Sequence, residues 1–282
     1  SLIAFAATLP KLRRRVEADL HGRGLPRERV VASVVRLLDN TLIRVGNDAY
    51  AQENNSFGLT TLRSRHLEVD GSSLRFSFTG KSGQKWRLKL SDRRIASVIR
   101  AIQELPGQRL FQYLDEEGER HDIRSHDVND YIRQAIGEDF TSKHFRTWGA
   151  TVSAVLELAE TPLPASKREQ AIALNAVLDR VARMLRNTRA VCRRCYVHPA
   201  VIKAWQQGRL GEEIAAVRQR LPRPLKGFDV EESAVLRWLS RHEDGRQELV
   251  AVRPGRSAPS RPPARRSGRS NRSPRPARHR GR

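Results

Sequence analysis

The hydrophobic pattern of this chain changes its period once, between residues 59 and 90, and that change limits the fold to a mixed one. On both sides of this stretch, apolar residues recur every three or four positions, as on one face of a helix. Inside it they alternate with polar residues, as on strands with one buried face. The alternating residues are Leu67 and Val69, then Leu74, Phe76 and Phe78, and finally Trp86, Leu88 and Leu90. We therefore expect a small three-stranded antiparallel sheet, with Lys81 in the turn between its last two strands.

Helical spacing predicts the rest of the fold. Helices are expected at 11–21, 27–40, 92–104, 126–136, 142–159, 166–187, 199–207, 210–219 and 230–242. The fold class is therefore α+β and mostly α, with one sheet near the N-terminus.

Positive charge dominates the composition, with 53 Lys and Arg against 31 Asp and Glu, a net charge of +22. A field of that sign favours polyanions, and nucleic acid is the first candidate. Residues 253–282 hold eleven Arg and neither Asp nor Glu. Because such a segment buries too little apolar surface to order its backbone, we expect a disordered basic tail at 246–282 after a folded domain at 1–245. Arg265 and Arg266 in that tail are expected to contact phosphates.

Several other classes of protein are disfavoured. No run of about 18 apolar residues is present, so no transmembrane helix is expected, and the first ten residues lack the pattern of a signal peptide. Two cysteines cannot build a disulfide framework, which fits a reducing compartment. No phosphate-binding Walker motif occurs, so ATP is not implied. We expect a cytoplasmic protein with no membrane partner and no cofactor.

Four short stretches contain residue types suited to phosphate chemistry. They are Ile43-Arg44-Val45-Gly46-Asn47, Gly80-Lys81-Ser82-Gly83, Lys143-His144-Phe145-Arg146-Thr147-Trp148-Gly149, and the segment from Asn187 to Tyr196-Val197-His198-Pro199. Together with Gly58-Leu59-Thr60-Thr61-Leu62 and Arg65-His66-Leu67, they resemble the catalytic domain of type IB DNA topoisomerases, in the poxvirus-like bacterial branch. Each motif alone is weakly specific, but their order and spacing together are distinctive.

The resemblance implies a role for each of five residues. Tyr196 corresponds to the nucleophile that attacks a DNA phosphate and forms a 3′-phosphotyrosine. Arg44 and Arg146 correspond to the arginines that bind the non-bridging oxygens, for which a guanidinium fork is well shaped. Lys81 corresponds to the general acid that protonates the departing 5′-oxygen. Asn187 stands where the family has His or Asn, and its amide can only donate or accept hydrogen bonds there.

Further cations are candidates for contact with the DNA backbone. Arg193 and Arg194 flank Tyr196, and Lys143 lies three residues before Arg146. Lys143 either contacts phosphate or faces water. Lys85 and Lys89 are alternatives to Lys81 as the general acid, but they lie within a strand and are expected to be solvated.

Cys192, Cys195 and His198 have a spacing that suggests a metal site. No fourth ligand is evident, and Tyr196 lies inside the set. We therefore expect two free thiols and no metal.

The resemblance implies a monomeric, nucleoid-associated enzyme that relaxes positive and negative supercoils in duplex DNA without ATP or metal. Family members usually carry an N-terminal β-rich domain that closes a clamp around DNA. Since this sequence starts at or near the catalytic domain, we expect a fragment or an incomplete gene product with reduced duplex affinity. The alternatives are a tyrosine recombinase, which shares the fold and the covalent chemistry, and a basic DNA-binding protein without catalysis.

Overall fold

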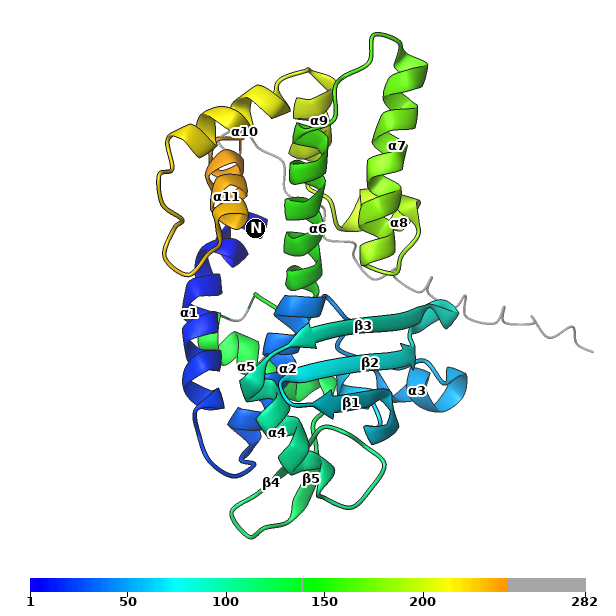
Figure 1. Ribbon diagram of the computed structural model, residues 1–282, viewed down its shortest axis with the longest axis vertical. Coiled ribbons are helices and arrows are strands. Elements are labelled where there is room, and N and C mark those ends of the chain that lie inside the picture. The colour runs from blue at the N-terminus through cyan, green and yellow to red at the C-terminus, as the bar shows by residue number, and fades with distance from the viewer. Residues whose placement is uncertain (138, 243–282) are drawn as a thin grey trace, which may run out of the picture. The chain divides into compact units, whose positions relative to one another are not determined.

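The computed structural model describes residues 1–137 and 139–242 (Figure 1). It confirms the expected fold class, since the described part is mostly helical with a small three-stranded antiparallel sheet. The helices are α1 (Leu2–Leu20), α2 (Arg27–Thr41), α3 (Asp48–Asn54), α4 (Arg93–Gln103), α5 (Ser125–Ile136), α6 (Ser142–Ala159), α7 (Lys167–Met184), α8 (Arg189–Cys195), α9 (Pro199–Gln206), α10 (Leu210–Gln219) and α11 (Val230–His242). The tail predicted at 246–282, with Arg265 and Arg266, lies outside the described residues, as do residues 243–245 of the predicted domain.

The sheet follows the alternation in the sequence. Its strands are β1 (Leu67–Asp70), β2 (Ser73–Thr79) and β3 (Lys85–Ser91), paired in the order β1-β2-β3. Phe76 pairs with Leu88 and Phe78 with Trp86, so the apolar residues of both strands share one face. Residues Lys81–Gly83 form a single 3₁₀ turn between β2 and β3, which places Lys81 at the end of a hairpin as expected.

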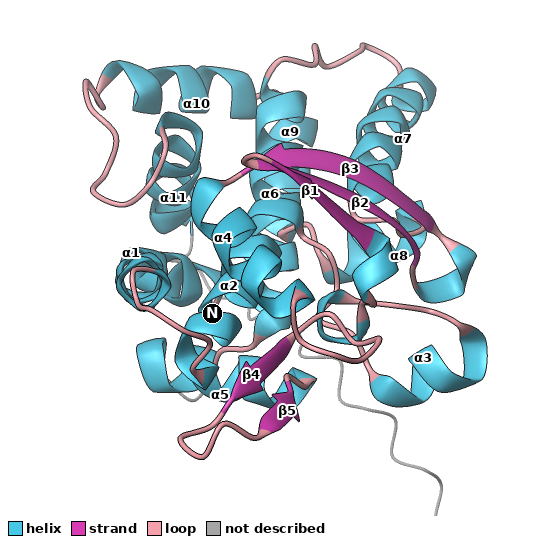
Figure 2. Ribbon diagram, turned by 60° about the horizontal axis from the view of Figure 1, so that its bottom comes forward, coloured by secondary structure: helices cyan, strands magenta, loops and turns pink. Residues whose placement is uncertain are grey.

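Helix α6 runs through the middle of the described part (Figures 1 and 2). It packs against α2 and α5 as well as against α9 and α10, and the latter two lie near its C-terminal end (Figure 1). Phe145, Trp148, Val155 and Leu158 are buried along it. Because α6 is fixed by this burial over its whole length, polar side chains near its start are held in place.

Two helix boundaries differ from the sequence prediction. Helix α1 begins at Leu2 rather than at residue 11, because Leu2, Phe5 and Leu9 extend its buried face across Pro10. The helix predicted at 166–187 ends at Met184, followed by a left-handed residue at Arg186, so Asn187 lies after the helix and not in it.

Two short helices and a short hairpin were not predicted. Helices α3 and α8 have only seven residues each, too few for a helical period to be visible. Strands β4 (Gln112–Leu114) and β5 (Arg120–Asp122) form a small hairpin, in which β5 is entirely polar and exposed. Because β5 buries no face, it shows no alternation of apolar and polar residues.

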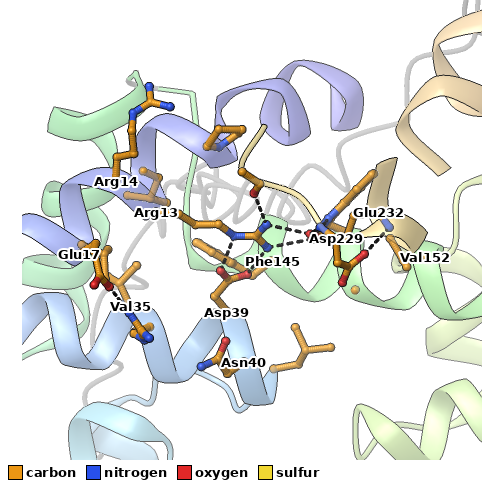
Figure 3. A pocket seen from close by; sticks show the side chains of 18 of the residues that line it. Arg13, Arg14, Glu17, Val35, Asp39, Asn40, Phe145, Val152, Asp229 and Glu232 are labelled. Carbon is orange, nitrogen blue, oxygen red and sulfur yellow. Dashed lines mark hydrogen bonds and ion pairs between the residues drawn. The ribbon is translucent and has the colours of Figure 1, made fainter. Parts of the chain in front are cut away.

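A partly buried ion-pair cluster joins the N-terminal helices to the C-terminal one of the described part (Figure 3). Arg13 of α1 donates to Asp39 of α2 and to Glu232 of α11, and Trp148 of α6 donates its indole N–H to Glu232 at 2.9 Å. Burial raises the pKa of Glu232, but the bonds from Arg13 and Trp148 outweigh it and the net shift is downward. The cluster borders a cavity of about 1190 Å³.

None of the described helices is both long enough and apolar enough to span a bilayer.

Candidate active site

A pocket of about 250 Å³ brings together four of the five predicted catalytic residues. Arg44, Lys81, Arg146 and Tyr196 all line it, although they come from four separate segments of the chain. Lys143 lines it too, at the start of α6, so this lysine faces the site. The fifth residue, Asn187, does not line the pocket but accepts a hydrogen bond from Arg44, which does.

Arg146 is anchored deep in the structure by backbone carbonyls. It projects from α6 with 3% of its surface exposed, and its guanidinium donates to the carbonyl oxygens of Leu42 and, at 2.8 Å, Leu185. Its Nε is buried and has no hydrogen-bond partner in the described structure. Burial, and then the charge of Arg44, lowers the pKa of Arg146 to about 10. The carbonyls therefore fix the guanidinium while one of its donors is left unoccupied.

Arg44 and Asn187 are joined directly. A terminal nitrogen of Arg44 donates to Oδ1 of Asn187 at 2.7 Å, although 143 positions separate the two residues. This bond fixes the orientation of the amide, whose Nδ2 is buried and has no partner among residues 1–137 and 139–242. Buried donors are rarely left unpaired in native structures. Two buried donors are thus unoccupied here in the described part of the chain: Nε of Arg146, which lines the pocket, and Nδ2 of Asn187, which is bonded to the pocket residue Arg44.

The segment that carries Arg44 is held in place by the close approach of another segment of the same chain, around Gly58. Helix α2 ends at Thr41, one residue beyond the predicted end, with Leu42 in the left-handed region. After α2, the carbonyl of Arg44 accepts from the amide of Leu59 at 2.9 Å. Gly46, at φ 101°, lies against Gly58.

We predict that Gly58→Ala lowers the stability of the fold and displaces Arg44. A Cβ at this position would lie 2.5 Å from two backbone atoms of Gly46 and 2.6 Å from the carbonyl oxygen of Arg44. Because backbone cannot rotate away as a side chain can, the loss is expected to be about 2–3 kcal/mol in urea denaturation. Ser56→Ala, two residues away, is the control and is expected to change stability by less than about 0.5 kcal/mol. An unchanged midpoint for Gly58→Ala would contradict this close packing.

Tyr196 caps the C-terminal end of α8. Its amide donates to the carbonyl of Cys192 at 3.0 Å, and its own carbonyl accepts from the Thr151 hydroxyl at 3.1 Å. The guanidinium of Arg146 lies 5.3 Å from the centre of its ring. Burial raises the pKa of the Tyr196 phenol, but the charges of Arg146 and Arg44 outweigh it, and the net shift is downward. The phenolate is therefore stabilised in this pocket.

Lys81 reaches the pocket from the β2–β3 hairpin. Its Nζ lies 5.3 Å from the ring centre of Tyr50, on α3. Lys85 instead donates to the hydroxyl of Thr79 at 2.9 Å, and neither Lys85 nor Lys89 lines the pocket. Of the three lysines of this hairpin, Lys81 is the one that faces Tyr196 and the arginines.

Arg193 and Arg194 are exposed on α8 and do not line the pocket. Cys192 is buried, which raises the pKa of its thiol to about 11, and Cys195 is partly exposed. His198 caps α9, accepting from the amide of Ala200 at 3.3 Å. Within the described ranges, no three His, Cys, Asp or Glu side chains are grouped so that they could hold a metal.

The structure adds pocket residues that the sequence analysis did not assign a role. Asn47 caps α3 through its side chain, Tyr50 stands over Lys81, and Ser142 begins α6. Asn47 lies in a stretch that was singled out, so its place could have been anticipated. Tyr50 lies on the short α3, which gave no detectable helical period.

Comparison with known proteins agrees with this geometry. Residues 2–221, which include all five site residues, match the family described as the catalytic core of eukaryotic DNA topoisomerase I. DNA topoisomerase 1B of Acanthamoeba polyphaga mimivirus is 31% identical over 212 residues, which are 73% of this chain and 63% of the viral protein. DNA topoisomerase 1 of Mycosarcoma maydis is 24% identical over 161 residues, which are 51% of this chain and 16% of the fungal protein. The chain thus spans less than two thirds of the length of each of these relatives. With most of its length matched to the catalytic core, the chain belongs to the DNA topoisomerase I family.

Proposed function

We propose that this chain is a type IB DNA topoisomerase that cleaves and rejoins one strand of duplex DNA through Tyr196. The observation that carries the proposal is the pocket in which the Tyr196 phenol faces two guanidinium groups, beside two buried donors that lack a partner. The oxygens of a phosphodiester placed there would accept hydrogen bonds from those donors. The family is known from the comparison, whereas the reaction is our proposal. The chain covers 63% and 16% of the two relatives described above.

Phosphate binding by this pocket follows from its donors. Arg146 Nε and Asn187 Nδ2 would bond the non-bridging oxygens, so that occupancy by phosphate relieves the penalty of leaving them buried and unpaired. Arg44 would add its charge while holding the Asn187 amide in place. The N-terminal end of α6, at Ser142 and Lys143, faces the same pocket and favours an anion there.

The reaction requires one proton to be removed and one to be supplied. The Tyr196 phenol loses its proton to solvent, and its oxygen forms a bond to phosphorus while the bond to the 5′-oxygen breaks. Lys81 gives its proton to that 5′-oxygen, leaving a 5′-hydroxyl and a 3′-phosphotyrosine. Religation reverses these steps after the free end has rotated. The positive groups that stabilise the pentacoordinate phosphorus belong to the chain, so neither metal nor ATP is needed.

The proposed partner is duplex DNA, bound by a monomer. Lys143 contacts the phosphate backbone at the site, and the exposed Arg193 and Arg194 extend that contact along α8. In the same proposal Arg265 and Arg266 neutralise phosphates without reading sequence.

We predict that cleavage depends on pH through Tyr196. The phenolate is the nucleophile and its pKa is lowered from 10.0, so the single-turnover rate should rise with pH and show an inflection below pH 10. Arg44→Ala removes a charge that favours the phenolate, and should move the inflection to higher pH as well as slow the reaction. Arg133→Ala, which is exposed on α5, pairs with Asp130 and does not line the pocket, is the control and should leave the inflection in place. An unmoved inflection in Arg44→Ala would show that another group is titrating.

Supercoiled plasmid tests the proposed function. The protein is incubated with plasmid in EDTA without ATP, and the distribution of linking numbers is read on a gel. We expect relaxation of both positive and negative supercoils. A shift in mobility with no change in linking number would indicate a DNA-binding protein without catalysis and would overturn the proposal.

A further inference from the structure

The turn after α7 has the backbone geometry at which glycine is usually found. The amide of Arg186 donates to the carbonyl of Arg183 at 3.0 Å, and that of Asn187 donates to the carbonyl of Ala182 at 2.8 Å. These two bonds define a Schellman motif, in which the first residue beyond the helix cap is left-handed. That residue is Arg186, with φ 51°. A side chain at such a position strains the backbone, so its presence calls for a compensating interaction.

The side chain of Arg186 crosses to the β2–β3 hairpin. Its guanidinium lies 5.5 Å from the ring centre of Trp86, on β3. The ring of Phe78 is nearly parallel to that of Trp86, with the two ring centres 6.0 Å apart. In both ribbon views β3 passes beside α8, which follows this turn (Figures 1 and 2). The contact therefore joins the segment of Asn187 and Tyr196 to the sheet.

Trp86 in turn supports the backbone beside Lys81. A Cβ on Gly80 would lie 2.8 Å from the indole nitrogen of Trp86, so glycine is needed for the ring to fit against the turn. The amide of Gly80 closes the turn by donating to the carbonyl of Gln84 at 2.7 Å. A movement of Trp86 would therefore displace the backbone at Gly80, one position before Lys81.

We propose that Arg186 is a positioning residue that holds the Lys81 turn against the segment carrying Asn187 and Tyr196, acting through Trp86. The proposal rests on the proposed function, because it assigns Lys81 the transfer of a proton to the 5′-oxygen. A general acid must stand within hydrogen-bond reach of the atom it protonates. Lys81 lies on an exposed turn, and the contact of Arg186 with Trp86 restricts the strand that leads out of that turn.

The first experiment separates positioning from folding. Arg186→Gly suits the left-handed backbone, so the melting temperature should stay within about 3 °C of the parent, as relief of strain offsets the lost stacking. Single-turnover cleavage should nevertheless fall by about 10- to 100-fold, the scale expected when a reacting group is misplaced by about 1 Å. Arg186→Lys keeps the charge but loses the planar guanidinium that lies over the Trp86 ring, and it should cleave nearly as slowly as Arg186→Gly. Arg183→Ala, which removes a charge from the last turn of α7, should cleave at the parent rate. A fall in melting temperature above about 8 °C for Arg186→Gly, or an unchanged rate, would overturn the proposal.

The second experiment asks whether the defect passes through Lys81. In a DNA substrate whose scissile 5′-oxygen is replaced by sulfur, the leaving group is a thiolate, which departs without a proton because thiols are far more acidic than alcohols. On that substrate Arg186→Gly should cleave within about threefold of the parent. A defect of equal size on both substrates would mean that Arg186 acts on the phosphate or on Asn187, and would overturn the assignment to Lys81. If the parent itself cleaves neither substrate, the proposed function fails instead, so the two failures are distinguishable.

Discussion

Replacing Tyr196 by phenylalanine is expected to abolish DNA cleavage while leaving the fold intact. The change removes only the hydroxyl. The ring stays beside the Arg146 guanidinium, and the backbone bonds to Cys192 and Thr151 do not involve the side chain. Loss of a nucleophile reduces rate by about 10⁴-fold or more, so no relaxation should be detectable. The readouts are the linking number of plasmid DNA and the thermal melting curve of the variant.

Tyr113→Phe is the matched control for that loss. Tyr113 lies on β4, stacked on His121 at 5.2 Å, and takes no part in the pocket. Its variant should relax plasmid at the parent rate. Residual relaxation by Tyr196→Phe at more than about a hundredth of the parent rate would contradict the assignment of the nucleophile.

Arg146→Lys is expected to produce the second largest loss. Lysine keeps a positive charge, but a single ammonium cannot bond the carbonyls of Leu42 and Leu185 and also reach a phosphate. Cleavage should fall by about 10²- to 10³-fold, as when a donor to a developing charge is removed. Since at least one buried carbonyl loses its partner, stability should fall by about 1–3 kcal/mol in urea denaturation.

Arg194→Lys makes the same substitution on the exposed face of α8, outside the pocket. It should change the cleavage rate by less than about threefold, since an exposed contact to the phosphate backbone needs charge more than shape. Equal rates for Arg146→Lys and the parent would show that the buried guanidinium does not bind the reacting phosphate.

The parts of the fold that the sequence predicted are those with a strong local period. The alternation at Phe76 and Phe78 defines β2, and the pattern around Phe145 and Trp148 defines α6, which carries Arg146 on its buried face. The position of Lys81 followed from the same pattern, because a polar, glycine-flanked segment between two alternating stretches forms a turn. These elements carry their own signal because each buries one face.

Other features depend on contacts between distant segments and leave little local signal. The helix predicted at 11–21 instead begins at Leu2, because burial on both sides of Pro10 keeps α1 continuous. The left-handed turn at Arg186 could not be anticipated, because arginine is an unusual residue there and its partner Trp86 lies 100 positions away. The unoccupied donors of Arg146 and Asn187 likewise became visible only when carbonyls and Arg44 were placed around them.

The central claim is that a single tyrosine becomes linked to DNA, and peptide mapping tests it directly. The protein is trapped on cleaved DNA with denaturant in EDTA, then digested with nuclease and trypsin. Trypsin cuts after Arg194 and Lys203, so the peptide of residues 195–203 contains Tyr196 and none of the other three tyrosines of the chain. We predict that this peptide alone gains the mass of a nucleotide joined through a 3′-phosphate. An adduct on a peptide containing Tyr50, Tyr113 or Tyr131, or no adduct from protein that relaxes DNA, would contradict the account.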